Sequence, residues 1–135
     1  MKGERLETLR IEATKSSPMV DLNGNKNLLR IEGESYPEDA AKFYSPVFKW
    51  VEKYLAWVEG PVLVELRISY LNTSSLKCIM TFLDMLEDSY RKGADIAVSW
   101  CYDRDNEIAI ECGKEFQEDL VLPFTLREDN DEMSG

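Results

Sequence analysis

The 135-residue chain contains no histidine, and this absence removes a large group of enzyme mechanisms. Serine–histidine–aspartate and cysteine–histidine catalysis both need an imidazole, as do the zinc site with two helical histidines and a phosphorelay through histidine. The chain also has no glycine-rich phosphate-binding loop. We therefore expect a protein that is not an enzyme and that has no catalytic residues, metal or cofactor.

Cysteine and basic residues are also scarce. The three cysteines, Cys78, Cys101 and Cys112, match no zinc-binding or disulfide pattern, which is typical of a reducing compartment. With 16 Lys and Arg against 26 Asp and Glu, the net charge of −10 disfavours nucleic-acid binding. No apolar run approaches the ~18 residues of a membrane span, and the charged N-terminus is unlike a signal peptide. These features predict a cytoplasmic protein without nucleic-acid or membrane partners.

Hydropathy alternates between strand and helix periods along what we expect to be one α/β domain. Each predicted strand has apolar residues at every second position, so helices should cover only one face of the sheet. Strands separated by helices should be parallel, whereas an N-terminal hairpin at Asn23-Gly24 makes the sheet mixed. The predicted domain spans residues 1–127, followed by an acidic, disordered tail at residues 128–135. Predicted strands include residues 6–14, 28–33, 62–68, 96–100 and 120–126, and predicted helices are residues 35–58, 76–90 and 103–117.

The segment Asn72-Thr73-Ser74-Ser75 is the strongest candidate for a functional site. It joins the end of a predicted strand to a helix N-terminus, and function concentrates at that edge of open α/β sheets. One interpretation is a helix cap, in which Asn72 or Thr73 accepts from a backbone N–H. The other is a phosphoacceptor, since a phosphate adds about −1.5 to −2 charges at the positive end of the helix dipole. Such a modification would change the surface beside Tyr70 and Leu71, which suits a switch that a partner reads.

Two other groups of residues have simpler explanations. Asp103, Asp105 and Glu107 resemble a calcium loop only weakly, because Ile108 stands where that loop needs glycine, and helix capping explains them better. The aromatic residues of the first helix cannot all share one face, so we expect Trp50 or Trp57 to be partly exposed. An exposed tryptophan is either part of a binding surface or a partly covered amphipathic ring.

Four blocks of the sequence form a distinctive set. They are residues 33–38 (GESYPE), 43–47 (FYSPV) with Trp50 and Tyr54-Leu55, 70–75 (YLNTSS), and Glu115-Phe116 with Pro123-Phe124. These blocks resemble the SiaC family of bacterial regulatory phosphoproteins. The resemblance extends over residues 6–126 and implies a STAS-like fold, the fold of anti-sigma-factor antagonists. It also implies a switch phosphorylated at Thr73, with Ser74 and Ser75 as alternative acceptors.

The resemblance further implies a set of partners. A Ser/Thr kinase with a histidine-kinase-like ATPase fold would add the phosphate, and a PP2C-type phosphatase would remove it. In the family's best-understood members the unphosphorylated form binds and activates a diguanylate cyclase, which promotes cyclic-di-GMP signalling and biofilm formation. Tyr70, Leu71, Asn72 and Ser74 would then form the partner-binding surface. The residues alone leave open a constitutive adaptor that is not regulated by phosphorylation, and also the effector, the oligomeric state and the direction of the response.

Overall fold

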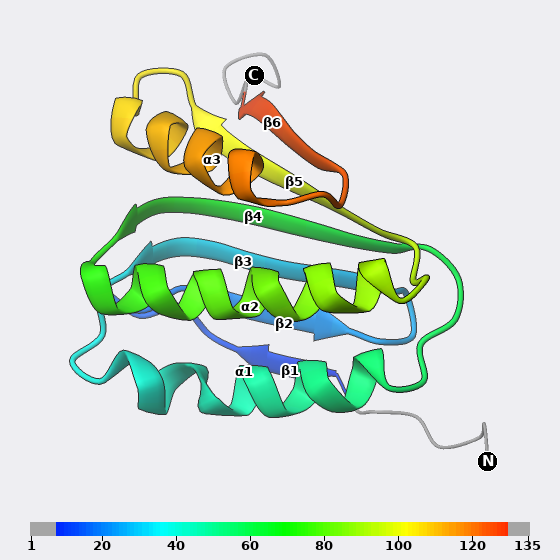
Figure 1. Ribbon diagram of the computed structural model, residues 1–135. Coiled ribbons are helices and arrows are strands. Elements are labelled where there is room, and N and C mark those ends of the chain that lie inside the picture. Colours follow the sequence, from blue (N-terminus) through cyan, green and yellow to red (C-terminus); the bar gives the residue numbers. More distant parts are fainter. Residues whose placement is uncertain (1–7, 130–135) are drawn as a thin grey trace.

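A computed structural model describes residues 8–129, which form a six-stranded sheet with helices on one side (Figure 1). The strands lie in the sheet in chain order, β1-β2-β3-β4-β5-β6. The first three strands pair antiparallel, and the last four are parallel to one another. The predicted mixed and mostly parallel α/β sheet is therefore confirmed. The strands are β1 (Leu9–Ile11), β2 (Met19–Asn23), β3 (Leu28–Ser35), β4 (Val62–Leu71), β5 (Ile96–Asp103) and β6 (Phe124–Asp129).

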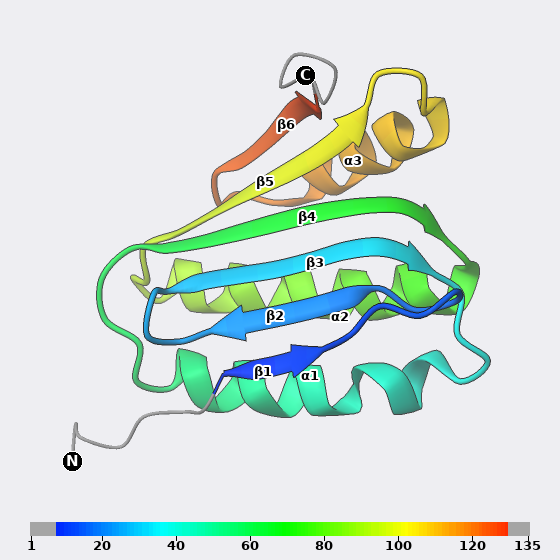
Figure 2. The same cartoon turned by 180° about the vertical axis from the view of Figure 1, so that it is seen from behind.

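The helices are α1 (Ala40–Leu55), α2 (Thr73–Arg91) and α3 (Glu107–Asp119). All three cover the same face of the sheet, and Figure 2 shows the opposite face without a helix in front of it. This arrangement confirms the expectation that the alternating strands have one covered face and one face open to water. Within residues 8–129, no helix combines the length and the apolar character that crossing a membrane requires.

Helices α1 and α3 start later than predicted because their capping residues lie later in the sequence, whereas α2 starts at Thr73, before the predicted residue 76. Asp39 is the N-cap of α1, and its side chain accepts from the Lys42 amide at 3.0 Å. Residues 35–38, which were expected to open this helix, are the end of β3 and a short connection. Similarly, β5 continues to Asp103, and Asn106 caps α3 by accepting from the Ala109 amide at 3.0 Å.

The last strand continues past residue 127, where the predicted domain ended. β6 begins at Phe124, after Pro123, and includes Glu128 and Asp129, which had been assigned to the tail. The Nε of Arg67 lies 2.7 Å from Oδ2 of Asp129, so an ion pair joins the end of β6 to β4. Residues 130–135 lie outside the described residues. β6 forms an edge of the sheet, as Pro123 predicted.

The core lies between the sheet and the three helices. The largest fully buried side chains are Trp100 from β5, Tyr44 and Tyr54 from α1, and Phe82 from α2. Of the two tryptophans at the predicted surface of α1, Trp50 is buried and Trp57, just after the helix, is 40% exposed. Cys101 is buried inside β5.

Charged residues on the open face form a connected set of ion pairs. The residues next to buried Leu29, Ile31, Val64 and Leu66 point away from the helices because side chains alternate along a strand. Paired strands β3 and β4 therefore place Arg30 opposite Glu65 and Glu32 opposite Arg67. The Glu32 carboxylate is 2.7 Å from Arg30 and 2.9 Å from Arg67.

Candidate functional site

A β-bulge lies near the end of β4, just before the predicted phosphorylation site. The β3 partners of Ile68 and Tyr70 are consecutive residues, so Ser69 is an extra residue in β4. A bulge of this kind changes which face the following side chains point to. Tyr70 is consequently 46% exposed, whereas Leu71 packs against the core.

Asn72 is the N-cap of α2. Its side-chain Oδ1 accepts from the Ser75 amide at 2.8 Å, and its carbonyl accepts from the Leu76 amide at 2.8 Å. Its own N–H donates to the Ser35 carbonyl at 3.0 Å, which ties the start of α2 to the end of β3. Of the two capping candidates, Asn72 therefore has this role. Thr73 is the first helical residue.

The three hydroxyl residues that follow Asn72 differ sharply in accessibility. Thr73 and Ser74 are exposed, whereas Ser75 is fully buried. The Ser35 hydroxyl donates to Ser75 Oγ at 2.8 Å and lies 2.7 Å from the hydroxyl of Tyr44. Because Ser35 uses its single proton toward Ser75, Tyr44 is the donor to Ser35. Ser75 is thus part of the interior, and Thr73 and Ser74 are the hydroxyls that another protein can reach.

The chain of buried hydroxyls joins three elements at one point. Tyr44 comes from α1, Ser35 from β3 and Ser75 from α2. Burial raises the pKa of Tyr44 to about 12, so the phenol keeps its proton at neutral pH. These bonds hold the first turn of α2 against α1 and β3. Sequence reasoning gave no separate role to Ser35 or Tyr44. The signal that could have revealed Ser35 was a serine at an inward-facing position of the strand.

The surface beside Thr73 is aromatic. The rings of Tyr36 and Tyr70 meet edge to face, with centroids 5.9 Å apart and an interplanar angle of 71°. Of the predicted partner-binding residues, Tyr70 and Ser74 are exposed, while Leu71 and Asn72 are half-buried. Tyr36 was not among the predicted partner-binding residues, because it follows β3 and is distant in sequence from Tyr70.

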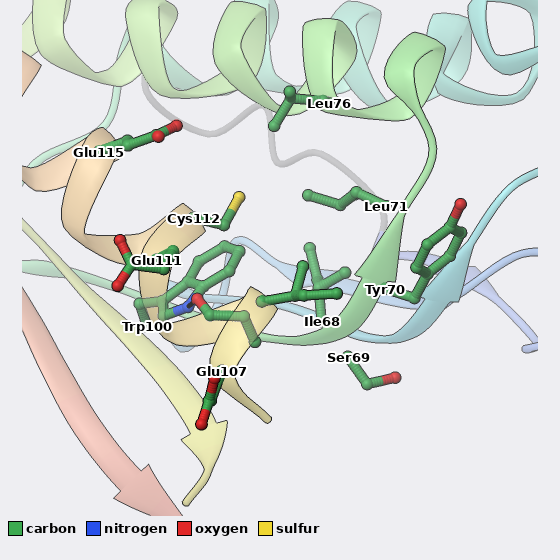
Figure 3. A pocket seen from close by; sticks show the side chains of 12 residues that line it. Ile68, Ser69, Tyr70, Leu71, Leu76, Trp100, Glu107, Glu111, Cys112 and Glu115 are labelled. Carbon is green, nitrogen blue, oxygen red and sulfur yellow. Dashed lines mark hydrogen bonds between the residues drawn. The ribbon is translucent and has the colours of Figure 1, made fainter. Parts of the chain in front are cut away.

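A groove of about 420 Å³ opens next to this edge, between α2 and α3 (Figure 3). Ile68 and Trp100 form its buried floor, and the Trp100 Nε1–H donates to the Ala109 carbonyl at 2.9 Å. Sequence reasoning missed the groove because its lining comes from four separate elements. The lining also includes Leu71, Leu76, Glu107, Ile108, Glu111, Cys112 and Glu115.

The acidic segment before α3 contains a turn and a helix cap. Asp103 Oδ1 accepts from the Asp105 amide at 2.9 Å, and Glu107 lies in the first turn of the helix. The cap residue, Asn106, also donates from Nδ2 to the Ser69 carbonyl at 2.9 Å, so it joins α3 to the bulge of β4. In the part of the chain that the structure describes, no three potential metal ligands gather into a site. Glu107 is therefore a first-turn acid, as predicted, whereas the helix cap is Asn106 and none of the three acidic residues.

Sequence comparison identifies the family. The profile of the SiaC family of regulatory phosphoproteins matches residues 11–129. The chain belongs to this family. An uncharacterized protein of Pseudomonas aeruginosa is 38% identical over 122 residues, which are 90% of this chain and 97% of that protein.

Solved structures of SiaC from Pseudomonas aeruginosa share the fold, with a TM-score of 0.86 in each case. One is 35% identical, over 92% of this chain and all of that one. Apo-SiaC is 37% identical, over 90% of this chain and 99% of that one. A third structure shows SiaC in complex with the diguanylate cyclase SiaD, of which SiaC is the activator, at 38% identity over 90% and 99% of the two chains. The similarity confirms the resemblance seen in the sequence and the α/β architecture that it implied.

Proposed function

We propose that this chain is a non-enzymatic signalling protein whose binding to a partner is switched by phosphorylation of Thr73. The observation that carries this proposal is the contrast among the three hydroxyls: Thr73 is exposed on the first turn of α2, while Ser75 is sealed inside. Membership of a family of regulatory phosphoproteins supports a modified hydroxyl rather than a catalytic one.

The proposed module contains a kinase, a phosphatase and an effector. A Ser/Thr kinase of the histidine-kinase-like ATPase fold adds the phosphate, and a PP2C-type phosphatase removes it. The complex of SiaC with the diguanylate cyclase SiaD supports a diguanylate cyclase as the effector. The chain would then act in the cytoplasm as a partner-switching component of cyclic-di-GMP signalling and biofilm control.

A phosphate on Thr73 is compatible with the folded state. The first amides of a helix have no intrahelical acceptor, and the helix dipole favours an anion there by about 0.3–1 kcal/mol. The cap itself comes from Asn72, whose bond to the Ser75 amide does not involve the Thr73 hydroxyl. Phosphorylation should therefore change the surface between Tyr70 and α2 and leave the fold intact.

The direct test is incubation of the full chain with ATP and a kinase of this class from the same bacterium, followed by intact-mass measurement. The expected result is one added phosphoryl group on the wild type and none on Thr73→Ala. Because Thr73 is exposed and is not the cap, Thr73→Ala should change the free energy of unfolding by less than about 0.5 kcal/mol. No mass gain on the wild type, or an equal gain on Thr73→Ala, would reject Thr73 as the acceptor.

Two serine variants serve as matched controls. Ser74→Ala removes the other exposed hydroxyl, and Ser75→Ala removes the buried one. Both variants should still be phosphorylated. Loss of the added mass in Ser74→Ala alone would move the acceptor to Ser74.

A further inference from the structure

The groove between α2 and α3 has an apolar interior with a large exposed apolar residue at its mouth. Ile68, Leu71, Leu76 and Trp100 contribute hydrocarbon and aromatic surface to the interior. Ile108, from the first turn of α3, is 72% exposed beside it. Apolar surface of this kind on an otherwise charged protein marks an interaction site.

Three evenly spaced glutamates line the α3 side of the groove. Glu107, Glu111 and Glu115 follow one another at intervals of four residues, so they lie on one side of α3 about 6 Å apart. Within residues 8–129, no cation pairs with any of the three. Burial, together with the Glu115 carboxylate, raises the pKa of Cys112, which lines the groove, to about 11. The negative charge of Glu115 therefore acts on the groove.

The groove lies on the same side of α2 as Thr73. Thr73, Leu76, Met80 and Glu87 are separated by three, four and seven residues, which places them on one stripe of the helix. The Glu87 carboxylate accepts from the Leu122 amide at 3.0 Å, in the connection from α3 to β6, so the stripe faces α3. Leu76 lines the groove, and Met80 is 44% exposed one turn further along. Thr73 therefore lies about one turn before Leu76, on the side of α2 that faces the groove.

We infer that this groove binds an amphipathic helix of a partner protein, with apolar side chains inserted between α2 and α3 and Lys or Arg residues along the α3 rim. Apolar anchors at helical spacing are the recognition mode that a groove between helices serves. Unpaired glutamates on one rim select a basic partner over an acidic one, because charges of the same sign across an interface are unfavourable. A role of Thr73 in controlling this groove rests on the proposed function, whereas occupation of the groove needs no kinase.

The test is selection of helix-forming peptides on the immobilised full chain. The displayed library carries Leu, Ile, Met or Phe along one helical stripe and either Lys or Glu at the flanking positions. Ile108→Ser is matched with Val121→Ser, since both residues are exposed and only Ile108 lines the groove. Glu111→Lys is matched with Glu52→Lys, which makes the same change of charge on α1, away from the groove.

The expected result is enrichment of Lys-flanked peptides. Their affinity should fall about tenfold on Ile108→Ser and about fivefold on Glu111→Lys, and it should be unchanged on both control variants. Failure to enrich any peptide, enrichment of Glu-flanked peptides, or equal losses on the control variants would overturn the inference. Phosphorylation of the wild-type protein, measured in parallel, separates the two proposals. If Thr73 is modified and no peptide binds, the groove inference fails and the switch stands.

Discussion

Replacing Gly113 by alanine should destabilise the protein, because α3 approaches β5 at this residue with no space for a methyl group. A Cβ at position 113 would lie 2.5 Å from Cδ1 and 2.7 Å from Nε1 of Trp100, and 2.8 Å from Cδ2 of Leu126. The Trp100 ring is fully buried, and its Nε1–H is bonded to the Ala109 carbonyl. It therefore cannot move aside without losing that bond and the floor of the groove.

Two opposing effects set the size of the change. An extra methyl group in a packed core costs about 1–3 kcal/mol, whereas alanine favours a helix over glycine by about 1 kcal/mol. We expect a net loss of about 1–2 kcal/mol, which lowers the melting temperature by about 3–8 °C in a domain of this size. Thermal and urea unfolding followed by circular dichroism measures the effect, with Glu111→Ala on the exposed side of α3 as control. A melting temperature at or above that of the wild type would refute the close approach of α3 to Trp100.

Three further predictions concern the polar groups of the interior. Burial alone would raise the pKa of Glu87, but the Leu122 and Val121 amides and Arg91 bond to its carboxylate and hold the pKa below its ordinary value. Its stabilising contribution is therefore present above the unfolded pKa of about 4.3 and lost as the pH falls through the lower folded value. Glu87→Gln should cost about 1–3 kcal/mol at pH 7, and this difference in unfolding free energy should shrink below pH ~4; a difference that is constant down to pH 3 would contradict the pKa shift. Tyr44→Phe removes the donor to Ser35 and should lower the free energy of unfolding by about 1 kcal/mol in urea titrations; unchanged stability would mean that this bond contributes nothing. Cys112, with its pKa near 11, should react with thiol reagents at pH 8 far more slowly in the folded than in the urea-unfolded protein, and equal rates would disprove the shift.

Element types and sheet layout were predictable from the sequence, because they depend on the period of the apolar residues. Alternation along the strands predicted one covered face, and helical crossovers predicted parallel strands. Element ends were not predictable to the residue. Several residues before α1 and α3 are good capping residues, and the choice of Asp39 and Asn106 depends on where β3 and β5 end. The end of β5 at Asp103 depends in turn on its pairing with Asp129 in β6, at the far end of the chain.

In the candidate site, too, some features follow from neighbouring residues in the sequence and others depend on long-range contacts. The strand, the polar segment and the helix start around Thr73 are neighbours in sequence, so their pattern indicated the site directly. The contrast between exposed Thr73 and buried Ser75 was not readable, because Ser75 is held by Ser35, forty residues earlier. The bulge at Ser69, which exposes Tyr70, appears only in the register of β3 against β4.

The central claim is that a phosphate on Thr73 changes what this protein binds. The most direct measurement is the affinity of the purified full chain for a diguanylate cyclase from the same bacterium, with and without stoichiometric phosphorylation at Thr73. If Thr73 is the proposed switch, the two dissociation constants should differ by about tenfold or more, which is within the usual range of coupling between sites. Equal dissociation constants for the two forms would contradict the switch and favour an adaptor that binds irrespective of phosphorylation.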